Sequence, residues 1–283
     1  MTNRLFPERC DEGAVEYING YPVPPVARMQ PLRAARSMIR IFRDIEETSH
    51  VYDLFQAVSG KAYRQGFEQL SQTDYGRRIL DGEVRIEELL SQRDWLASLP
   101  EGTVGHCYYK MVETKGFAVD GLLAAAKHAG IDVHAPTMFE AYRRYFIHFE
   151  VSHDLWHVLS GYDTDALGEI CLLEVYRGQW PDIGLRLLML MGTIGAMAER
   201  FDHRKNIRRA IREGYRHGQQ ADFILAADIE RLLQLPLKQA RAELNIKEPK
   251  IYRSIPYAVR RDLQGGGQTV QGQPEPVFEV GWT

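Results

Sequence analysis

Apolar residues recur every three or four positions over most of this 283-residue chain, which is the spacing of an amphipathic helix. The first two runs of this kind are Leu32, Ala35, Met38, Ile39 and Phe42, and then Val51, Leu54, Phe55 and Val58. Strand signals are sparse, and we recognise no hairpin dipeptide between alternating apolar runs. The pattern predicts an all-α protein with no sheet larger than a hairpin.

The composition changes at both ends of the chain. Residues 1–31 contain five prolines and are predicted to form an extended N-terminal arm. Residues 264–283 are rich in Gly, Gln and Pro and are predicted to form a flexible tail. Residues 32–263 are predicted to form a single helical domain.

Two consecutive helices are predicted in the middle of the chain. Thr137 is predicted to cap a long helix that runs to Ser160, and Gly161 then ends it. Asp163 or Thr164 is predicted to cap the next helix. Because the connection is so short, the two helices are expected to pack antiparallel.

These two helices carry the candidate chemistry. Each residue of a helix turns about 100°, so His157 lies about 40° from His153, and Asp154 lies about 100° from it. Two imidazoles one turn apart can bind a single metal ion, and Asp154 adds an oxygen donor beside them. Glu169, early in the second helix, can face back across the turn towards His157. The spacing predicts a metal site on two consecutive antiparallel helices.

The donor set leaves the metal open. Zinc is the first choice for two nitrogens and two oxygens, and ferrous iron and manganese also accept them. Glu150 lies on the same helix face one turn before the motif, so it could hold a histidine N–H or bind the metal in place of Glu169. The remaining histidines are isolated in the sequence and are predicted to be structural or solvated.

The motif and its surroundings resemble one known family. His-Asp-x-x-His, followed twelve residues later by Glu, is similar to the signature of the Coq4 family. The surrounding stretch HDLWHVLSGYDTDALGEI also resembles that family, and so do LPEGTVGHCYYKM (99–111) and residues 214–246. The likeness covers about residues 32–246.

This resemblance implies a role in ubiquinone biosynthesis. It implies loss of the C1 carboxylate from a polyprenyl-hydroxybenzoate head group, coupled to hydroxylation at that carbon. It makes His153, Asp154, His157 and Glu169 the catalytic metal ligands. The implied partners are a prenylated aromatic lipid as substrate, other quinone-biosynthesis enzymes and a membrane surface.

Two other functions compete with this one. The first is a non-catalytic, prenyl-lipid-binding scaffold that organises other biosynthetic enzymes. The second is a metal phosphohydrolase or peptidase. No clear second His pair or distant Asp motif completes a phosphohydrolase site, and Asp154 stands where an HExxH peptidase has Glu.

A run of apolar residues at 187–198 has two interpretations. It is apolar on every face, which is typical of a central core helix. It could also form one wall of a tunnel for a prenyl tail, with Leu190 against the tail. Asp182 is predicted to cap this helix.

Two groups of arginines could contact anions. Arg143 and Arg144 precede the metal motif, where an arginine could hold a substrate carboxylate. Arginines also recur every four positions from Arg200 to Arg216. Such a stripe is either a solvated face or a contact for anionic lipid head groups.

Composition narrows the classes of partner and compartment. The formal net charge is −3, which argues against nucleic acid as the main partner. The three cysteines are far apart and form no CxxC pattern, so a reducing compartment fits best. The first 20 residues resemble neither a secretory signal nor an acid-poor transit peptide.

No apolar run reaches the roughly 20 residues that a spanning helix needs. The expected location is therefore the cytoplasm, peripheral to the inner face of the membrane, as in a bacterial-type protein. Whether the chain forms a homo-oligomer is left open.

Overall fold

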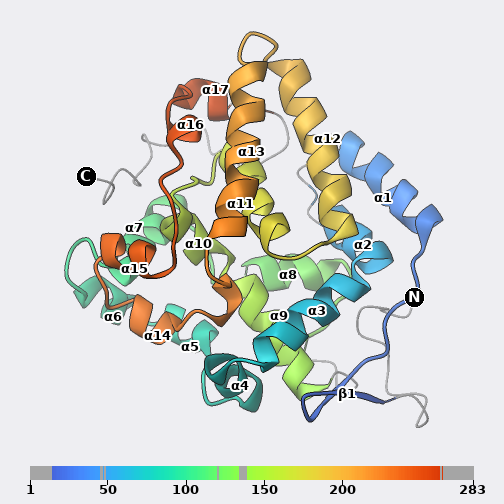
Figure 1. Cartoon of the computed structure of the whole chain (residues 1–283), viewed down its shortest axis with the longest axis vertical. Helices are drawn as coiled ribbons and strands as arrows, with labels where there is room; N and C mark the ends of the chain where they lie inside the picture. The colour runs from blue at the N-terminus through green and yellow to red at the C-terminus, as the bar shows by residue number, and fades with distance from the viewer. Residues whose placement is uncertain are drawn as a thin grey trace. The chain divides into compact units, whose positions relative to one another are not determined.

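The computed structural model describes residues 15–44, 47, 49–119, 121–133, 139–261 and 263. Helices dominate this part of the chain, which confirms the predicted all-α class (Figure 1). The predicted cap Thr137, the predicted tail and the first half of the predicted arm lie outside the described residues. The predicted domain boundaries stay predictions.

The chain divides into two compact units. The first unit contains the described residues up to Ser91, together with Val119–Ser152 and Asp182–Leu185. Its elements are β1 (Glu16–Ile18), β2 (Tyr21–Val23), α1 (Pro31–Arg43), α2 (Ser49–Val58), α3 (Gly60–Ser71), α4 (Asp74–Asp81), α5 (Ile86–Leu90), α8 (Gly121–His128) and α9 (Glu140–Val151). An aromatic cluster forms its core, in which the Phe67 ring lies 5.4 Å from Tyr142 and 5.7 Å from Tyr145 between centroids.

The predicted extended arm contains a small hairpin instead. β1 and β2 pair antiparallel, with Ile18 opposite Tyr21. The two turn residues between them, Asn19 and Gly20, have φ of 49° and 88°. Asn-Gly is the preferred sequence for such a two-residue turn because both residues tolerate positive φ. The interpretation that the sequence contains no hairpin dipeptide was therefore wrong, because it overlooked Asn19-Gly20.

The second unit contains the candidate metal motif. It consists of Gln92–Ala118, His153–Pro181 and the described residues from Arg186 onward. Its elements are α6 (Arg93–Ser98), α7 (Val104–Lys115), α10 (His153–Ser160), α11 (Ala166–Gln179), most of α12 (Ile183–Glu199), α13 (Arg204–Gln220), η1 (Ile224–Ala226), α14 (Ile229–Leu232), α15 (Leu237–Glu243), α16 (Lys250–Arg253) and α17 (Tyr257–Arg261).

Helices α11 and α13 run side by side and pack closely (Figure 1). Glycines allow this approach: a Cβ atom on Gly214 would lie 2.5 Å from the Cys171 carbonyl oxygen, and one on Gly218 would lie 2.1 Å from that of Val175. Both distances are far below van der Waals contact. The close packing gives α11, which carries Glu169, a rigid neighbour along its length.

The helix predicted to run to Ser160 is interrupted at Ser152. Helix α9 ends there, and α10 begins directly after it at His153. The Ser152 hydroxyl donates to the Phe149 carbonyl oxygen at 3.2 Å, and serine bonds of this kind to the preceding turn often bend helices. The sequence pattern missed the interruption because the apolar spacing continues across it.

The cap of α11 also differs from the prediction. Asp165 is the N-cap, and its Oδ1 accepts from the Gly168 N–H at 2.8 Å. Asp163 instead accepts from the Thr164 N–H at 2.7 Å within the loop. Three acceptors in a row, at 163–165, made the sequence ambiguous. By contrast, Asp182 caps α12 as predicted, since its Oδ1 accepts from the Leu185 N–H at 3.0 Å.

Helix α12 is not a central core helix. Met189 and Ala196 are buried, whereas Leu190 and Ile194 are each 57 % exposed. The side chains on the two faces are equally apolar, so the sequence could not show which face would be covered. Within the described residues, no helix has both the length and the apolar character that crossing a bilayer requires.

Candidate metal centre

Three of the four candidate ligands lie on the first two turns of α10. One ligand atom from each of His153, Asp154 and His157 lies within 4.8 Å of the others. The two imidazole rings have centroids 5.0 Å apart and planes at 84°. The His157 side chain is fully buried, while those of His153 and Glu169 are 18 % and 24 % exposed, so solvent reaches the group at these two residues.

Glu169 completes the group from the first turn of α11. Its Oε1 lies 3.2 Å from His157 Nε2, and its Oε2 lies 3.4 Å from His153 Nε2. Each carboxylate oxygen therefore faces a different imidazole. Gly161, with φ of 75°, allows the reversal between α10 and α11. Side chains separated in the sequence thus meet as the spacing predicts.

The proposed alternative ligand, Glu150, has a different partner. It belongs to the first unit, where it is buried and its Oε2 accepts from the Tyr52 hydroxyl at 2.6 Å. Glu169 is the carboxylate within 3.4 Å of both motif histidines. These two distances make Glu169 the fourth member of the candidate group.

A backbone carbonyl determines the tautomer of His157. His157 Nδ1 lies 2.9 Å from the Tyr162 carbonyl oxygen, and a carbonyl oxygen can only accept, so Nδ1 carries a proton. In a neutral ring, Nε2 then presents a lone pair. This buried nitrogen lies near Glu169 but outside hydrogen-bond geometry. A lone pair that faces a carboxylate needs a proton or a metal ion between them.

The pKa values reflect this unfavourable juxtaposition. Burial lowers the pKa of His157, but the charges of Glu169 and Asp154 outweigh burial and raise it to about 9. Burial raises the pKa of Glu169, but the two imidazoles outweigh it and hold that pKa well below its usual range. Burial raises the pKa of Asp154. A proton between His157 and Glu169 is therefore strongly held. A metal ion that binds there would displace this proton.

The residues fit a divalent metal. His153, Asp154 and His157 offer ligand atoms that lie close together, and Glu169 lies within 3.4 Å of both imidazoles. The buried His157 already has its other ring nitrogen hydrogen-bonded to a carbonyl. That second hydrogen bond is the usual arrangement for a metal-binding histidine. Zinc, ferrous iron and manganese all accept this donor set.

A buried arginine holds the end of α10. Arg241 Nε and Nη2 donate to the carbonyl oxygens of Leu159 and Val158, each at 2.9 Å. These carbonyls have no partner within the helix, and a cation at a helix C-terminus also stabilises the dipole. Burial lowers the pKa of Arg241 to about 10, which leaves it charged at neutral pH.

Two aromatic residues near the group were not found from the sequence. The Tyr176 ring stacks on His153, with centroids 6.0 Å apart and planes at 16°. Tyr176 is seven residues after Glu169 and so lies on the same helix face, a spacing that could have revealed it. The Tyr108 hydroxyl is fully buried and has no hydrogen-bond partner among the described residues. Burial and the Asp154 charge raise its pKa, so it stays protonated.

The other predicted contact residues are Arg143, Arg144 and Leu190. Arg143 and Arg144 belong to the first unit, where both form ion pairs with Glu140. They also line a cavity of about 230 Å³ in that unit. Leu190 lies on the exposed side of α12. A Cβ atom on Gly192 of α12 would lie 3.6 Å from the side chain of Ile170, the residue after Glu169.

The family of this chain follows from a comparison with known families. A family model described as "Coenzyme Q (ubiquinone) biosynthesis protein Coq4" matches residues 21–250. The chain belongs to the Coq4 family. The matched residues include the His-Asp-x-x-His motif of α10 and Glu169 of α11.

Curated proteins with the same family name are similar to it. The mitochondrial COQ4 protein of Eremothecium gossypii is 27 % identical over 221 residues, which cover 77 % of this chain and 65 % of that protein. The mitochondrial COQ4 homolog of Aedes aegypti is 28 % identical over 185 residues, which cover 65 % and 63 %. Both are named ubiquinone biosynthesis proteins. The matched part spans slightly less than two thirds of their length.

A solved structure shares the fold. It is a protein from Nostoc punctiforme PCC 73102 whose assignment to ubiquinone biosynthesis is itself provisional. The TM-score is 0.55 at 19 % sequence identity, and the likeness covers 78 % of this chain and 100 % of the other. At this sequence identity, the likeness supports a shared helical fold and nothing further.

Proposed function

We propose that this chain acts in ubiquinone biosynthesis as a metal-dependent enzyme. Its substrate would be a polyprenyl-hydroxybenzoate that loses its C1 carboxylate and gains a hydroxyl at the same carbon. One observation carries the proposal: Glu169 meets both imidazoles of the His-Asp-x-x-His helix within 3.4 Å. Membership of the Coq4 family supports the pathway.

The reaction is a two-electron oxidation. The bond between C1 and the carboxyl carbon breaks, carbon dioxide leaves, and a bond from C1 to oxygen forms. Dioxygen is the proposed oxidant. One molecule each of the acid, dioxygen and water would then give the hydroxylated ring, carbon dioxide and hydrogen peroxide. When bound, a divalent metal would stabilise negative charge on the head group as a Lewis acid, and iron could in addition carry electrons.

The chain itself would bind and orient the head group. The four candidate ligands are His153, Asp154, His157 and Glu169. Tyr108 stays protonated and has no hydrogen-bond partner among the described residues, so its hydroxyl can donate to an anionic oxygen of the substrate. The fully buried side of the group, at His157, excludes water, while the partly exposed His153 and Glu169 mark the open side.

The prenyl tail would lie along α12. Leu190 and Ile194 are one turn apart and expose an apolar surface on this helix. Helix α12 lies close to α11 near Glu169, because Gly192 approaches Ile170. A lipid bound with its head at the candidate ligands and its tail on this surface would use both features.

Contact with an anionic membrane surface would bring the substrate to the protein. Arg204, Arg208, Arg212 and Arg216 are exposed along α13. In the first unit, α1 exposes Leu32 and Phe42 beside Arg36, Arg40 and Arg43, and it contains no acidic residue. Apolar and basic side chains together suit the interface of an anionic bilayer. The proposed location is the cytoplasm, at the inner face of the membrane, with other quinone-biosynthesis enzymes as partners.

The test is release of labelled carbon dioxide from a carboxyl-labelled prenyl-hydroxybenzoate. Metal-loaded wild type should turn over, and Glu169→Ala should lower the rate by at least about 100-fold, since removal of even an outer-shell partner costs 10- to 100-fold. The matched control is Glu243→Gln, an exposed site on α15, which should keep the wild-type rate.

Other outcomes identify the competing functions. If wild type and Glu169→Ala both give the uncatalysed rate while prenylated lipid co-purifies with the protein, the scaffold function replaces the enzyme. Turnover of a phosphate ester or a peptide that depends on Glu169 would instead indicate a metal hydrolase.

A further inference from the structure

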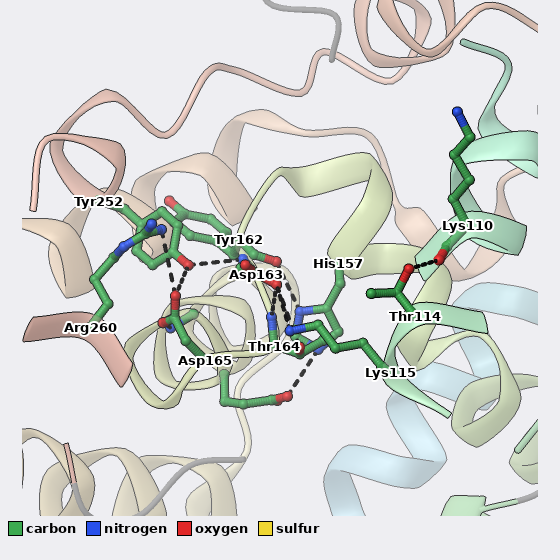
Figure 2. Close-up of polar contacts among 12 residues, drawn as sticks. Lys110, Thr114, Lys115, His157, Tyr162, Asp163, Thr164, Asp165, Tyr252 and Arg260 are labelled. Atoms are coloured by element: carbon green, nitrogen blue, oxygen red, sulfur yellow. Dashed lines mark hydrogen bonds and ion pairs between the residues drawn. The ribbon is translucent and has the colours of Figure 1, made fainter. Parts of the chain in front are cut away.

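The loop between the two ligand-bearing helices is held from the C-terminal end of the described chain. All five residues of the loop, 161–165, are buried. Helix α16 packs on α13, and α17 packs on α11. From these short helices, Tyr252 and Arg260 reach the loop, as Figure 2 shows. Both residues lie beyond the stretch 21–250 that the family model matches.

The Tyr252 hydroxyl makes one hydrogen bond towards each ligand-bearing helix. It accepts from the Asp163 N–H at 3.0 Å and donates to Asp165 Oδ2 at 2.7 Å (Figure 2). Asp165 uses its other oxygen to cap α11, where Oδ1 accepts from the Gly168 N–H at 2.8 Å. The same α11 carries Glu169 in its first turn.

The bond to Asp163 acts on His157 through a single peptide group. The peptide that joins Tyr162 to Asp163 contains both the Tyr162 carbonyl and the Asp163 N–H. The carbonyl oxygen accepts from His157 Nδ1 at 2.9 Å, and the N–H donates to Tyr252. Because a peptide group is planar, a partner that holds its N–H also fixes the direction of its carbonyl. Hydrogen bonds on both sides of one peptide also strengthen each other.

Surrounding contacts hold Tyr252 itself. The Arg260 guanidinium lies 4.5 Å from the centroid of the Tyr252 ring, and its Nη1 lies 3.5 Å from Asp165 Oδ2. The backbone N–H of Tyr252 donates to Glu213 Oε2 on α13 at 3.1 Å. Tyr252 is 1 % exposed, so its hydroxyl has little freedom to turn away from the loop.

We propose that Tyr252 is a positioning residue of the metal centre, supported by Arg260. Through the Tyr162–Asp163 peptide it orients His157, and through Asp165 it holds the start of α11 and hence Glu169. One hydroxyl thereby sets the relative placement of ligands from two helices. This inference rests on the proposed metal site and assigns a task to residues that do not touch the metal.

The decisive variant is Tyr252→Phe, which keeps the ring and removes both hydrogen bonds. Ser59→Ala is the matched control. It likewise removes only a buried hydroxyl, which donates to Asp182 Oδ1 at 2.6 Å in the first unit, away from the ligands' own loop. Zinc affinity is measured for the full chain by competition with a chromophoric chelator. Thermal unfolding of the metal-free proteins is measured in parallel.

We expect Tyr252→Phe to weaken zinc binding about 10- to 100-fold, the usual effect of losing a group that orients a metal ligand. Ser59→Ala should lower the melting temperature while it leaves zinc affinity unchanged. The visible spectrum of the cobalt-loaded protein should change in Tyr252→Phe and stay unchanged in Ser59→Ala. A purely structural Tyr252 would affect melting alone.

Equal zinc affinity in Tyr252→Phe and wild type would overturn the inference. If Tyr252→Phe does not fold, Arg260→Gln replaces it and should weaken zinc binding in the same direction, with Arg260→Lys closer to wild type. Unchanged affinity in Arg260→Gln would overturn the inference equally. A wild type that binds neither zinc nor cobalt would instead refute the proposed metal site, which is a distinguishable result.

Discussion

His157 uses its two ring nitrogens for different tasks. Nδ1 donates to the Tyr162 carbonyl, while Nε2 faces Glu169 at 3.2 Å. Because the ring is fully buried, no water can replace either partner. Among the four candidate ligands, loss of His157 should therefore weaken metal binding most.

His157→Ala is expected to remove most of the bound metal. A structural zinc site is worth about 10–16 kcal/mol in total, so losing one ligand should cost several kcal/mol of binding. Elemental analysis of the dialysed protein measures the effect. The control is His128→Ala, an exposed histidine at the end of α8, which should keep its metal. A full equivalent of metal in His157→Ala would show that the ligand assignment is wrong.

His217 should make stability depend on pH. Burial and the nearby charges of Arg216 and Lys247 lower its pKa to about 4, and its Nδ1 lies 3.1 Å from the Tyr162 hydroxyl. The unfolded chain protonates this group near its ordinary pKa of about 6.5. Between these values the unfolded state binds more protons, so stability falls as pH drops from about 6.5 to about 4, by up to about 3 kcal/mol.

Replacement of His217 with Gln tests this origin of the pH dependence. Gln keeps an acceptor for Tyr162 and cannot titrate. The melting temperature of the wild type should therefore drop more between pH 7 and pH 5 than that of His217→Gln. Parallel curves for the two proteins would assign the pH dependence to other groups.

The contact between α11 and α13 depends on a close approach of the two backbones. Gly218 approaches the Val175 carbonyl so closely that any side chain must push the helices apart. Gly218→Ala should therefore destabilise the protein by about 1–3 kcal/mol, as overpacking does. Urea unfolding measures it. In the control, Gly195→Ala on α12, the new Cβ meets nothing within 4 Å, so better helix propensity should stabilise by up to about 1 kcal/mol.

Helix α12 offers a test of where the prenyl tail lies. Leu190 is open to solvent, so a larger side chain would not block a tunnel there, whereas a charge would repel an apolar tail. Leu190→Glu should raise the KM of long-tailed substrates more than that of short-tailed ones. Gln220→Glu adds the same charge at an exposed site on α13 and should leave both values unchanged. An equal effect of Leu190→Glu on both substrates would remove α12 as the tail site.

At the scale of the whole molecule, charge is unevenly distributed. The formal net charge is −3, yet α13 exposes a row of arginines one turn apart. A local basic surface on an acidic protein attracts anionic membranes at short range. Reversing Arg208 and Arg212 to Glu should therefore weaken binding to anionic vesicles, and high salt should weaken binding of the wild type.

Reversal of Arg77 and Arg85 to Glu is the matched control for the vesicle experiment. Both arginines are exposed in the first unit, and the change in net charge is the same. This control should bind anionic vesicles better than the α13 variant. Wild-type binding that salt does not weaken, equal on neutral and anionic vesicles, would exclude an electrostatic contact.

The sequence by itself determined the helical class, most helix positions and the relation of the four candidate ligands. These depend on local periodicity: the two histidines one turn apart share a helix face, and a short loop that begins at Gly161 returns the chain to bring Glu169 beside them. Such short-range relations can be predicted without knowledge of how the rest of the chain packs. The Asn19-Gly20 hairpin also depends on local sequence, so the sequence alone could have predicted it.

Tertiary structure alone decided what surrounds those ligands. Tyr108, Tyr252 and Arg260 come from helices distant in the sequence, and a hydrogen bond across 89 residues leaves no periodic signal. Exposure was also undecidable for Leu190, since both faces of α12 are apolar and only packing determines which is covered. Local spacing therefore predicted the candidate site, while long-range contacts determined its support.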